Sequence, residues 1–231
     1  MRLHPLGRSA ALTYAVKFLA DAGVQIGPEA SQATHILLPV PSFTGDLELP
    51  PMDPHTVVIG GNLDRLPKGQ PRLDLLQEES YVAKNAMITA HCALGHILPR
   101  LPITLQDCPA LVIGWGRIGK CLCKLLSGLG ARVTVAARKS AHRAMAEALG
   151  YQAIDTAGID SVPYRLIVNT VPVMVLPQGG NALKIDLASQ PGIGGDDVLW
   201  ARGLPGKDAP ESSGKLLAET ILCKLNQEVI P

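Results

Sequence analysis

The sequence predicts an α/β protein of two lobes, the larger of which is built on a doubly wound parallel sheet. Two observations carry this prediction: a long helical pattern without proline divides the chain, and beyond it short apolar runs alternate with helical segments. Such alternation is typical of β-α-β units and parallel sheets. With 231 residues, of which 47% are hydrophobic and 18% charged, the chain is apolar enough to fold around real cores.

The first lobe, residues 1–84, is predicted to be a small flavodoxin-like α/β domain. It shows a helical pattern over residues 10–22 and strand-like runs at 35–39 and 56–60, separated by prolines. An opening strand over residues 1–6 would contain Pro5, which has no N–H to donate. We therefore expect this strand to form a clipped or weakly ordered edge.

The second domain, residues 101–231, follows a connection at 85–100 that belongs to a helix predicted over 80–98 and ended by Pro99. Strands are expected at 110–113, 132–136, 166–169, 184–187 and 198–201. Helices are expected at 117–129, at 141–149 and from 211 to about 227. The last helix would return toward the first lobe and cross the connecting helix.

Composition excludes several classes of function. Lys and Arg number 21 against 20 Asp and Glu, a net charge of +1 without a basic run, so no nucleic-acid footprint is present. No apolar stretch reaches the roughly 18 residues of a membrane span, and residues 1–11 do not resemble a signal peptide. We expect a cytoplasmic protein whose five scattered cysteines are buried free thiols, without a metal site.

A glycine-rich turn follows the first strand of the second domain. Its Gly-x-Gly-x-x-Gly spacing leaves an apolar strand and opens an amphipathic helix, the context that a Rossmann-type dinucleotide site requires. The first glycine permits the turn, the second admits a pyrophosphate, and the third lets helix and strand pack closely. The predicted contacts are Gly114, Trp115, Gly116, Arg117, Ile118 and Gly119.

The end of the second strand favours NADP over NAD. An NAD site usually carries Asp or Glu here for the ribose 2′-hydroxyl. This strand is followed instead by Arg138, Lys139, Ser140 and, after Ala141, His142. Cations and a hydroxyl suit a 2′-phosphate. The alternative, a solvated basic loop with NAD as cofactor, stays open.

Two later strand ends complete the expected cofactor site, since carboxyl ends of parallel strands open onto the ligand crevice. The residues concerned are Thr170, Val171 and Pro172 after one strand, and Asp186 and Leu187 at the end of another. These groups could line a nicotinamide and its ribose. For Asp186, a role as a loop or helix cap is an equal alternative.

The catalytic group is harder to identify. All six histidines precede residue 143, which disfavours an acid/base histidine late in the cofactor domain. His91, on the connecting helix with Asn85 and Thr89 nearby, is the candidate base, although a lone helix histidine is more often structural. Ser42 and Thr44, with Gly45, could bind a carboxylate in a small turn, or form an ordinary turn.

Taken together, these segments resemble the family of the dipicolinate synthase A subunit. The similarity runs in order through Leu37-Leu-Pro-Val40, Gly114-Trp-Gly-Arg-Ile-Gly119, Ala137-Arg-Lys-Ser-Ala-His142, Asn169-Thr-Val-Pro172, Asp186-Leu-Ala-Ser189 and Gly203-Leu-Pro-Gly206. The resemblance implies oxidation of dihydrodipicolinate to dipicolinate with a nicotinamide cofactor. It also implies a separate B subunit of dipicolinate synthase as partner, and a role in the mother cell of a sporulating bacterium. Ser42, Thr44, Asn85 and Thr89 would then hold the two carboxylates of the substrate.

The chain departs from the family pattern in two places. Its opening strand is shorter, and the family's Glu-Gly after the connecting Asn and Thr is replaced by His91-Cys92. Two other functions therefore stay open: an NADP-binding protein that is inactive without the B subunit, and a dehydrogenase of another small carboxylic acid. The sequence leaves open whether the chain forms a homo-oligomer.

Overall fold

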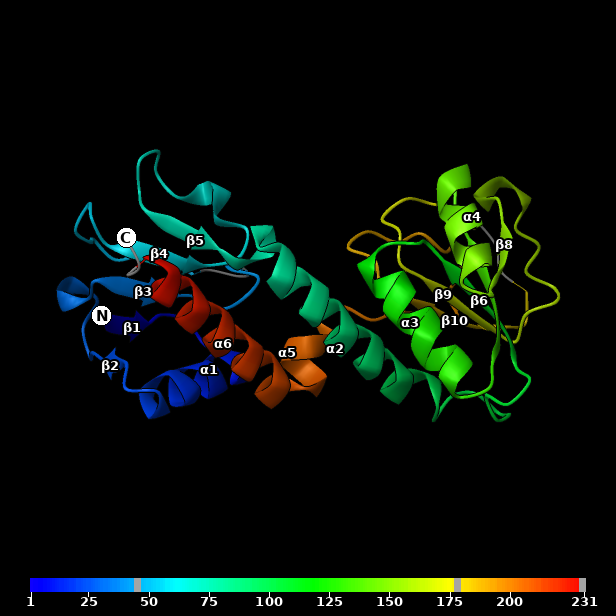
Figure 1. Ribbon diagram of the computed structural model, residues 1–231, viewed down its shortest axis with the longest axis horizontal. Coiled ribbons are helices and arrows are strands. Elements are labelled where there is room, and N and C mark those ends of the chain that lie inside the picture. The colour runs from blue at the N-terminus through cyan, green and yellow to red at the C-terminus, as the bar shows by residue number, and fades with distance from the viewer. Residues whose placement is uncertain (44–46, 177–179, 229–231) are drawn as a thin grey trace. The chain divides into compact units, whose positions relative to one another are not determined.

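The computed structural model describes residues 1–43, 47–176 and 180–228 (Figure 1). The chain divides into two compact units, one comprising Met1–Asn85 with Pro205–Pro231 and the other Ala86–Leu204. The sequence-based division differs at the C-terminus, since it assigned everything after residue 100 to the cofactor domain. The boundary near residue 85 lies inside one continuous helix, α2 (Glu79–Ile97).

The first unit contains a five-stranded parallel sheet. Its strands are β1 (Arg2–Pro5), β2 (Gln25–Ile26), β3 (His35–Leu37), β4 (Val57–Gly60) and β5 (Arg72–Asp74). The order β2-β1-β3-β4-β5 is the flavodoxin-like order. The predicted fold class of this lobe is therefore confirmed.

The expectation that the opening strand forms an edge is wrong. β1 lies between β2 and β3, and Leu3 is fully buried. The proline is tolerated because β2 pairs only with Arg2 and Leu3, so Pro5 lies beyond the shared ladder on that side. On the other side β1 pairs with β3 as far as Pro5, and the N–H of Leu6 donates to Leu37.

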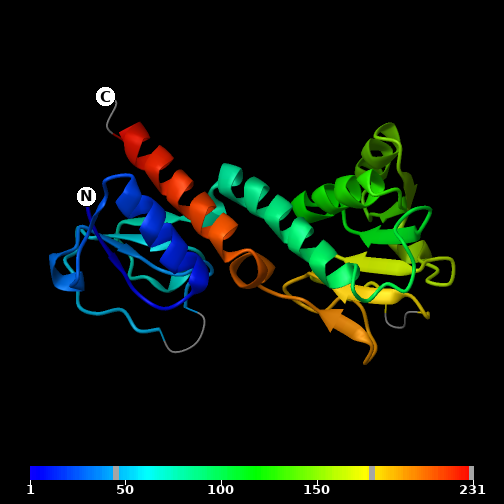
Figure 2. The ribbon, with the colours of Figure 1, turned by 90° about the horizontal axis from the view of Figure 1, so that it is seen from below.

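The C-terminal segment joins the first unit because helix α6 (Pro210–Glu228) lies beside α1 (Ala10–Asp21) (Figures 1 and 2). Gly214 makes this contact close. A Cβ there would lie 2.6 Å from the carbonyl oxygen of Ala11 and 2.8 Å from the nitrogen of Ala15. Gly214 therefore packs directly against α1, and the nearest atom to the added Cβ would be the Cβ of Tyr14. The sequence did not predict helix α5 (Leu204–Asp208), which precedes α6.

The second unit is a six-stranded parallel sheet. Its strands are β6 (Pro109–Ile113), β7 (Arg132–Ala136), β8 (Gln152–Ile154), β9 (Leu166–Asn169), β10 (Leu183–Asp186) and β11 (Val198–Trp200), and its helices include α3 (Arg117–Gly128) and α4 (Ser140–Ala148). The order β11-β10-β9-β6-β7-β8 is that of the Rossmann sheet, with the switch point between β6 and β9. The predicted doubly wound sheet is confirmed.

The side chains of β6, a central strand of this sheet, are mostly buried, and every second one lies on the same face. Leu111 and Ile113 pack with Ile167, Leu176 and Ile193 on one face. That face is closed by the loops that follow β9 and β10. The core therefore extends to the carboxyl edge and fixes the loops there.

The cysteines follow the prediction in part. Cys92, Cys108 and Cys123 are buried and Cys121 is half-buried, but Cys223 on α6 is exposed. Burial raises the pKa of the Cys123 thiol to about 12 and also raises the pKa of Cys108 and Cys121. In residues 1–43, 47–176 and 180–228, no helix is both long and apolar enough to cross a membrane.

Candidate functional site

The candidate site lies at the carboxyl ends of the strands in the second unit. Ile113, the last residue of β6, pairs with both Ala136 of β7 and Asn169 of β9. The loops that leave these three strands therefore start side by side at the switch point, where open parallel sheets bind ligands. They enclose a pocket of about 310 Å³.

Residues from all three loops, together with Thr156 from the segment after β8, line this pocket. They are Gly114, Trp115, Gly116, Ala136, Ala137, Arg138, Lys139, His142, Thr156, Val171, Pro172, Val173 and Val175. The structure thus brings together eight residues that the sequence pointed to, from the glycine turn, the basic loop and the segment after β9. Thr156 was missed because it follows β8, a three-residue strand whose pattern is too short to recognise.

The three glycines of the turn have different roles. Gly114 has a φ of +106°, and a Cβ there would overlap the hydroxyl of Thr170. A Cβ on Gly119 would overlap the carbonyl oxygen of Gly114. By contrast, nothing lies within 4 Å of the place where a Cβ of Gly116 would stand. The first and third glycines therefore serve packing, and the second leaves open space.

The N-terminus of α3 borders this open space. Gly116 is the N-cap of α3, and none of the described side chains caps the helix. The N-terminus of α3, which carries the positive end of the helix dipole, is therefore suited to an anionic group beside Gly116. The indole N–H of Trp115 is buried, and within the described parts of the chain it has no hydrogen-bond partner. The open space at Gly116 and the terminus of α3 suit a phosphate-containing ligand.

The basic wall of the pocket is held in place by Arg143, which the sequence analysis did not single out. Its guanidinium donates to the carbonyls of Ala137 at 2.8 Å and Arg138 at 2.9 Å. The same Nη1 atom forms an ion pair of 2.6 Å with Asp155, just beyond β8. Arg143 therefore fixes the backbone from which Arg138 and Lys139 project.

Asp186 supports the opposite wall. Its side chain is 1% exposed and accepts four hydrogen bonds. Oδ1 accepts from Asn169 Nδ2 and the N–H of Ala188, both at 2.9 Å, and Oδ2 accepts from the N–H groups of Gly192 at 2.7 Å and Ile193 at 3.2 Å. Because both oxygens are occupied, the structure places Asp186 in the loop that it organises, as the capping alternative expected.

Asn169 connects this carboxylate to the pocket. Its Nδ2 also donates to the carbonyl of Val171, and its Oδ1 accepts from the N–H of the same residue. Val171 lines the pocket. The Asn169–Asp186 pair therefore fixes the turn after β9 to the turn after β10.

The other predicted cofactor residues lie around the pocket and not in its lining. Arg117, Ile118 and Gly119 open α3, and Ser140 opens α4. The Thr170 hydroxyl donates to the carbonyl of Ile113 at 2.8 Å, and the N–H of Leu187 donates to Asn169. The hydroxyl of Thr170 and the N–H of Leu187 thus connect the ends of neighbouring strands beside the pocket.

In the structure, the hydroxyl of Ser42, which was predicted to bind a carboxylate, makes hydrogen bonds within the protein. Ser42 is 5% exposed, its hydroxyl donates to the carbonyl of Pro39 at 2.7 Å, and it accepts from the N–H of Gly61 at 3.0 Å. Both functions of the hydroxyl thus tie the loop after β3 to the loop after β4, as in the ordinary-turn alternative. Thr44 and Gly45 lie outside the described residues.

The helix α2 separates the proposed base from its expected neighbours. Thr89 is buried, whereas His91, two residues further on, is exposed. Two residues turn an α-helix by about 200°, so the two side chains leave opposite sides. Asn85 is the last helical residue assigned to the first unit. The structure therefore does not group His91 with Thr89.

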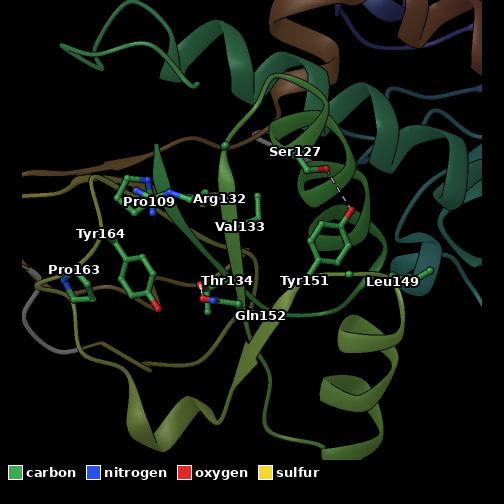
Figure 3. A pocket seen from close by; sticks show the side chains of 12 residues that line it. Pro109, Ser127, Arg132, Val133, Thr134, Leu149, Tyr151, Gln152, Pro163 and Tyr164 are labelled. Carbon is green, nitrogen blue, oxygen red and sulfur yellow. Dashed lines mark hydrogen bonds between the residues drawn. The ribbon is translucent and has the colours of Figure 1, made fainter. Parts of the chain in front are cut away.

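A larger pocket, of about 720 Å³, lies elsewhere in the second unit (Figure 3). Pro109, Arg132 and Gln152 in its lining begin β6, β7 and β8, so it lies at the amino ends of the strands. Figure 3 shows Tyr151 and Tyr164 on either side of Thr134, whose hydroxyl donates to Gln152 at 3.4 Å. This end is opposite the glycine turn and holds none of the predicted site residues.

Metal-ligating residues do not gather in the parts of the chain that the structure describes. No group of three or more His, Cys, Asp or Glu side chains there could hold a metal ion.

A comparison with known proteins identifies relatives. No protein-family model matches the sequence. The A subunit of dipicolinate synthase from Bacillus subtilis (strain 168) is 30% identical over 171 residues, which cover 67% of this chain and 57% of the relative. The chain thus spans less than two thirds of the length of this relative.

Solved structures share the fold. Dipicolinate synthase A chain from Bacillus subtilis superposes with a TM-score of 0.78 and 22% identity, covering 99% of this chain and 96% of that chain. The corresponding chain from Bacillus halodurans gives 0.80 and 20%, covering 97% of each. A transhydrogenase from Sinorhizobium meliloti gives 0.66 and 13%, covering 98% and 94%. The chain is thus similar to the A subunit of dipicolinate synthase over two thirds of its own length, and it shares the α/β fold of the Rossmann-type dehydrogenases.

Proposed function

We propose that this protein is an NADP-dependent oxidoreductase that converts dihydrodipicolinate to dipicolinate. The observation that carries the proposal is the pocket in which an open glycine turn faces Arg138, Lys139 and His142. A dinucleotide pyrophosphate would approach Gly116 and the start of α3, and a ribose 2′-phosphate would meet the cationic loop. Homology to the dipicolinate synthase A subunit supports the choice of substrate.

In this reaction the protein would contribute mainly by positioning the substrate ring against the nicotinamide. A bound nicotinamide would supply the acceptor for the hydride that leaves the dihydropyridine ring. The ring also loses a proton and becomes aromatic, which favours the reaction. The exposed side chain of His91 remains the sequence-based candidate for taking that proton, although its neighbour Thr89 is buried on another side of α2. Asn85 and Thr89 remain candidates for substrate carboxylates.

The partner in this proposal is the B subunit of dipicolinate synthase, and the setting is the mother cell during spore formation. Both follow from the relative and not from the geometry of this chain. The alternative in which the chain only binds NADP, and is active when the B subunit is present, fits the same pocket. A dehydrogenase of another small carboxylic acid would also use it.

Turnover tests the proposed function directly. The purified chain, alone and with the B subunit, is incubated with freshly generated dihydrodipicolinate and NADP⁺, while nicotinamide reduction and dipicolinate absorbance are followed together. We expect both signals to rise in a one-to-one ratio. A signal that requires the B subunit would identify the cofactor-binding alternative, and NADP⁺ binding without any product would point to another acid.

Two alanine substitutions in the glycine turn are expected to have different effects, one on cofactor binding and the other on folding. Gly116→Ala is expected to keep the melting temperature, because its φ of −80° suits alanine and the added methyl meets no atom. It should weaken NADP⁺ binding by about tenfold or more, since the methyl fills the space into which a pyrophosphate must come.

Gly119→Ala is the contrasting variant, because its methyl would overlap the backbone of Gly114. Overpacking of this kind costs about 1–3 kcal/mol, a loss of several degrees in melting temperature. Gly128→Ala, near no other atom, serves as the control. Calorimetric titration and thermal unfolding report the two effects, and normal NADP⁺ affinity in Gly116→Ala would contradict the assignment.

Cofactor preference depends on the basic loop. Arg138→Ala should weaken NADP⁺ binding by roughly tenfold, the value of a lost charge-assisted hydrogen bond, and leave NAD⁺ binding within about twofold. Arg132→Ala is the matched control, because Arg132 begins the same strand at its other end. Tighter binding of NAD⁺ than NADP⁺ to the unmodified chain, or no effect of Arg138→Ala, would reject the 2′-phosphate assignment.

A further inference from the structure

Trp200 is a large aromatic residue that is exposed and yet fixed. Its side chain is 44% exposed at the carboxyl end of β11. The indole N–H donates to the carbonyl of Ala188 at 2.9 Å, and the guanidinium of Arg202 lies 5.0 Å from the ring centroid. An exposed indole usually needs no such support, so its fixed orientation calls for a physical reason.

The register of the sheet places Trp200 on the edge that holds the candidate site. Trp200 pairs with Asp186 of β10, and Asp186 pairs with Asn169 of β9. Neighbouring strands lie about 4.8 Å apart, so the backbone of Trp200 is roughly 10 Å from that of Asn169. All of these residues belong to one compact unit.

Hydrogen bonds connect Trp200 to the wall of the pocket. Ala188, which accepts from the indole, donates its own N–H to Asp186. Asp186 binds Asn169, which holds both backbone groups of Val171 in the pocket wall. The indole is therefore positioned by the same carboxylate that positions the pocket.

The Trp200–Arg202 pair has a defined chemical preference. A guanidinium lying over an indole forms a flat cationic surface that can stack on a planar ring. The guanidinium can also donate two parallel hydrogen bonds to a carboxylate. A planar ring that carries carboxylates satisfies both surfaces, whereas an aliphatic acid would use only the guanidinium.

We infer that Trp200 and Arg202 contact the substrate, with the indole against its ring and the guanidinium on one of its carboxylates. This inference rests on the proposed function and deepens it, since it names two residues that would hold the cyclic dicarboxylate. Val173 adds an exposed apolar side chain to the lining of the pocket.

Binding of pyridine-2,6-dicarboxylate tests the inference without turnover. The full chain, saturated with NADP⁺, is titrated calorimetrically with this product. Trp200→Ala and Arg202→Gln are each expected to weaken its binding by roughly tenfold, the equivalent of one lost ring contact or charge-assisted hydrogen bond. NADP⁺ affinity should stay within about twofold, which also shows that the variants are folded.

Controls lie at the other end of the same sheet. Val162→Ala removes another exposed apolar side chain, and Arg165→Gln removes another exposed guanidinium. Neither should change binding of the dicarboxylate. Equal affinity in the unmodified chain and in both Trp200→Ala and Arg202→Gln would overturn the inference and leave the proposed function intact. Failure of the unmodified chain to bind the dicarboxylate would overturn both.

Discussion

A buried carboxylate holds the functional edge of this protein together. Asp186 ends β10, is buried, and accepts four hydrogen bonds from Asn169 and from the loop that follows it. A buried charge is tolerated only when it is satisfied in this way, and the low dielectric around it strengthens each bond. The loops after β9 and β10 are therefore constrained together, and with them one wall of the pocket.

A few residues of the pocket have distinct structural roles. Two glycines serve close packing and a third leaves room for a ligand, while Arg143 fixes the backbone that carries the cations. The side chain of Asp186, whose chemistry would suit a ligand, is used to fix loops. The surface that would face a ligand is thus formed mainly by backbone, small side chains and a cationic loop. Buried polar contacts stabilise the loops behind it.

Much of this could be predicted from the sequence. The long apolar runs, such as β6 and β9, and the glycine spacing of 114–119 establish the fold and the turn because they are strong local signals. The strands β2, β5 and β8 have two or three residues each, too few for any periodicity. The partners of Asp186 and Arg143 come from separate segments, and only the register of the folded sheet brings them together. The exposure of His91 likewise depends on which side of α2 is buried.

Hydrogen–deuterium exchange of Asp186→Asn is the measurement that tests the central constraint most directly. The amide would turn one acceptor into a donor facing backbone N–H groups, leaving buried donors unsatisfied at about 1–3 kcal/mol each. We expect faster exchange at residues 170–175 and 187–193 with residues 132–143 unchanged. Unchanged protection of both loops would contradict the account, because the pocket wall would then stand without the carboxylate.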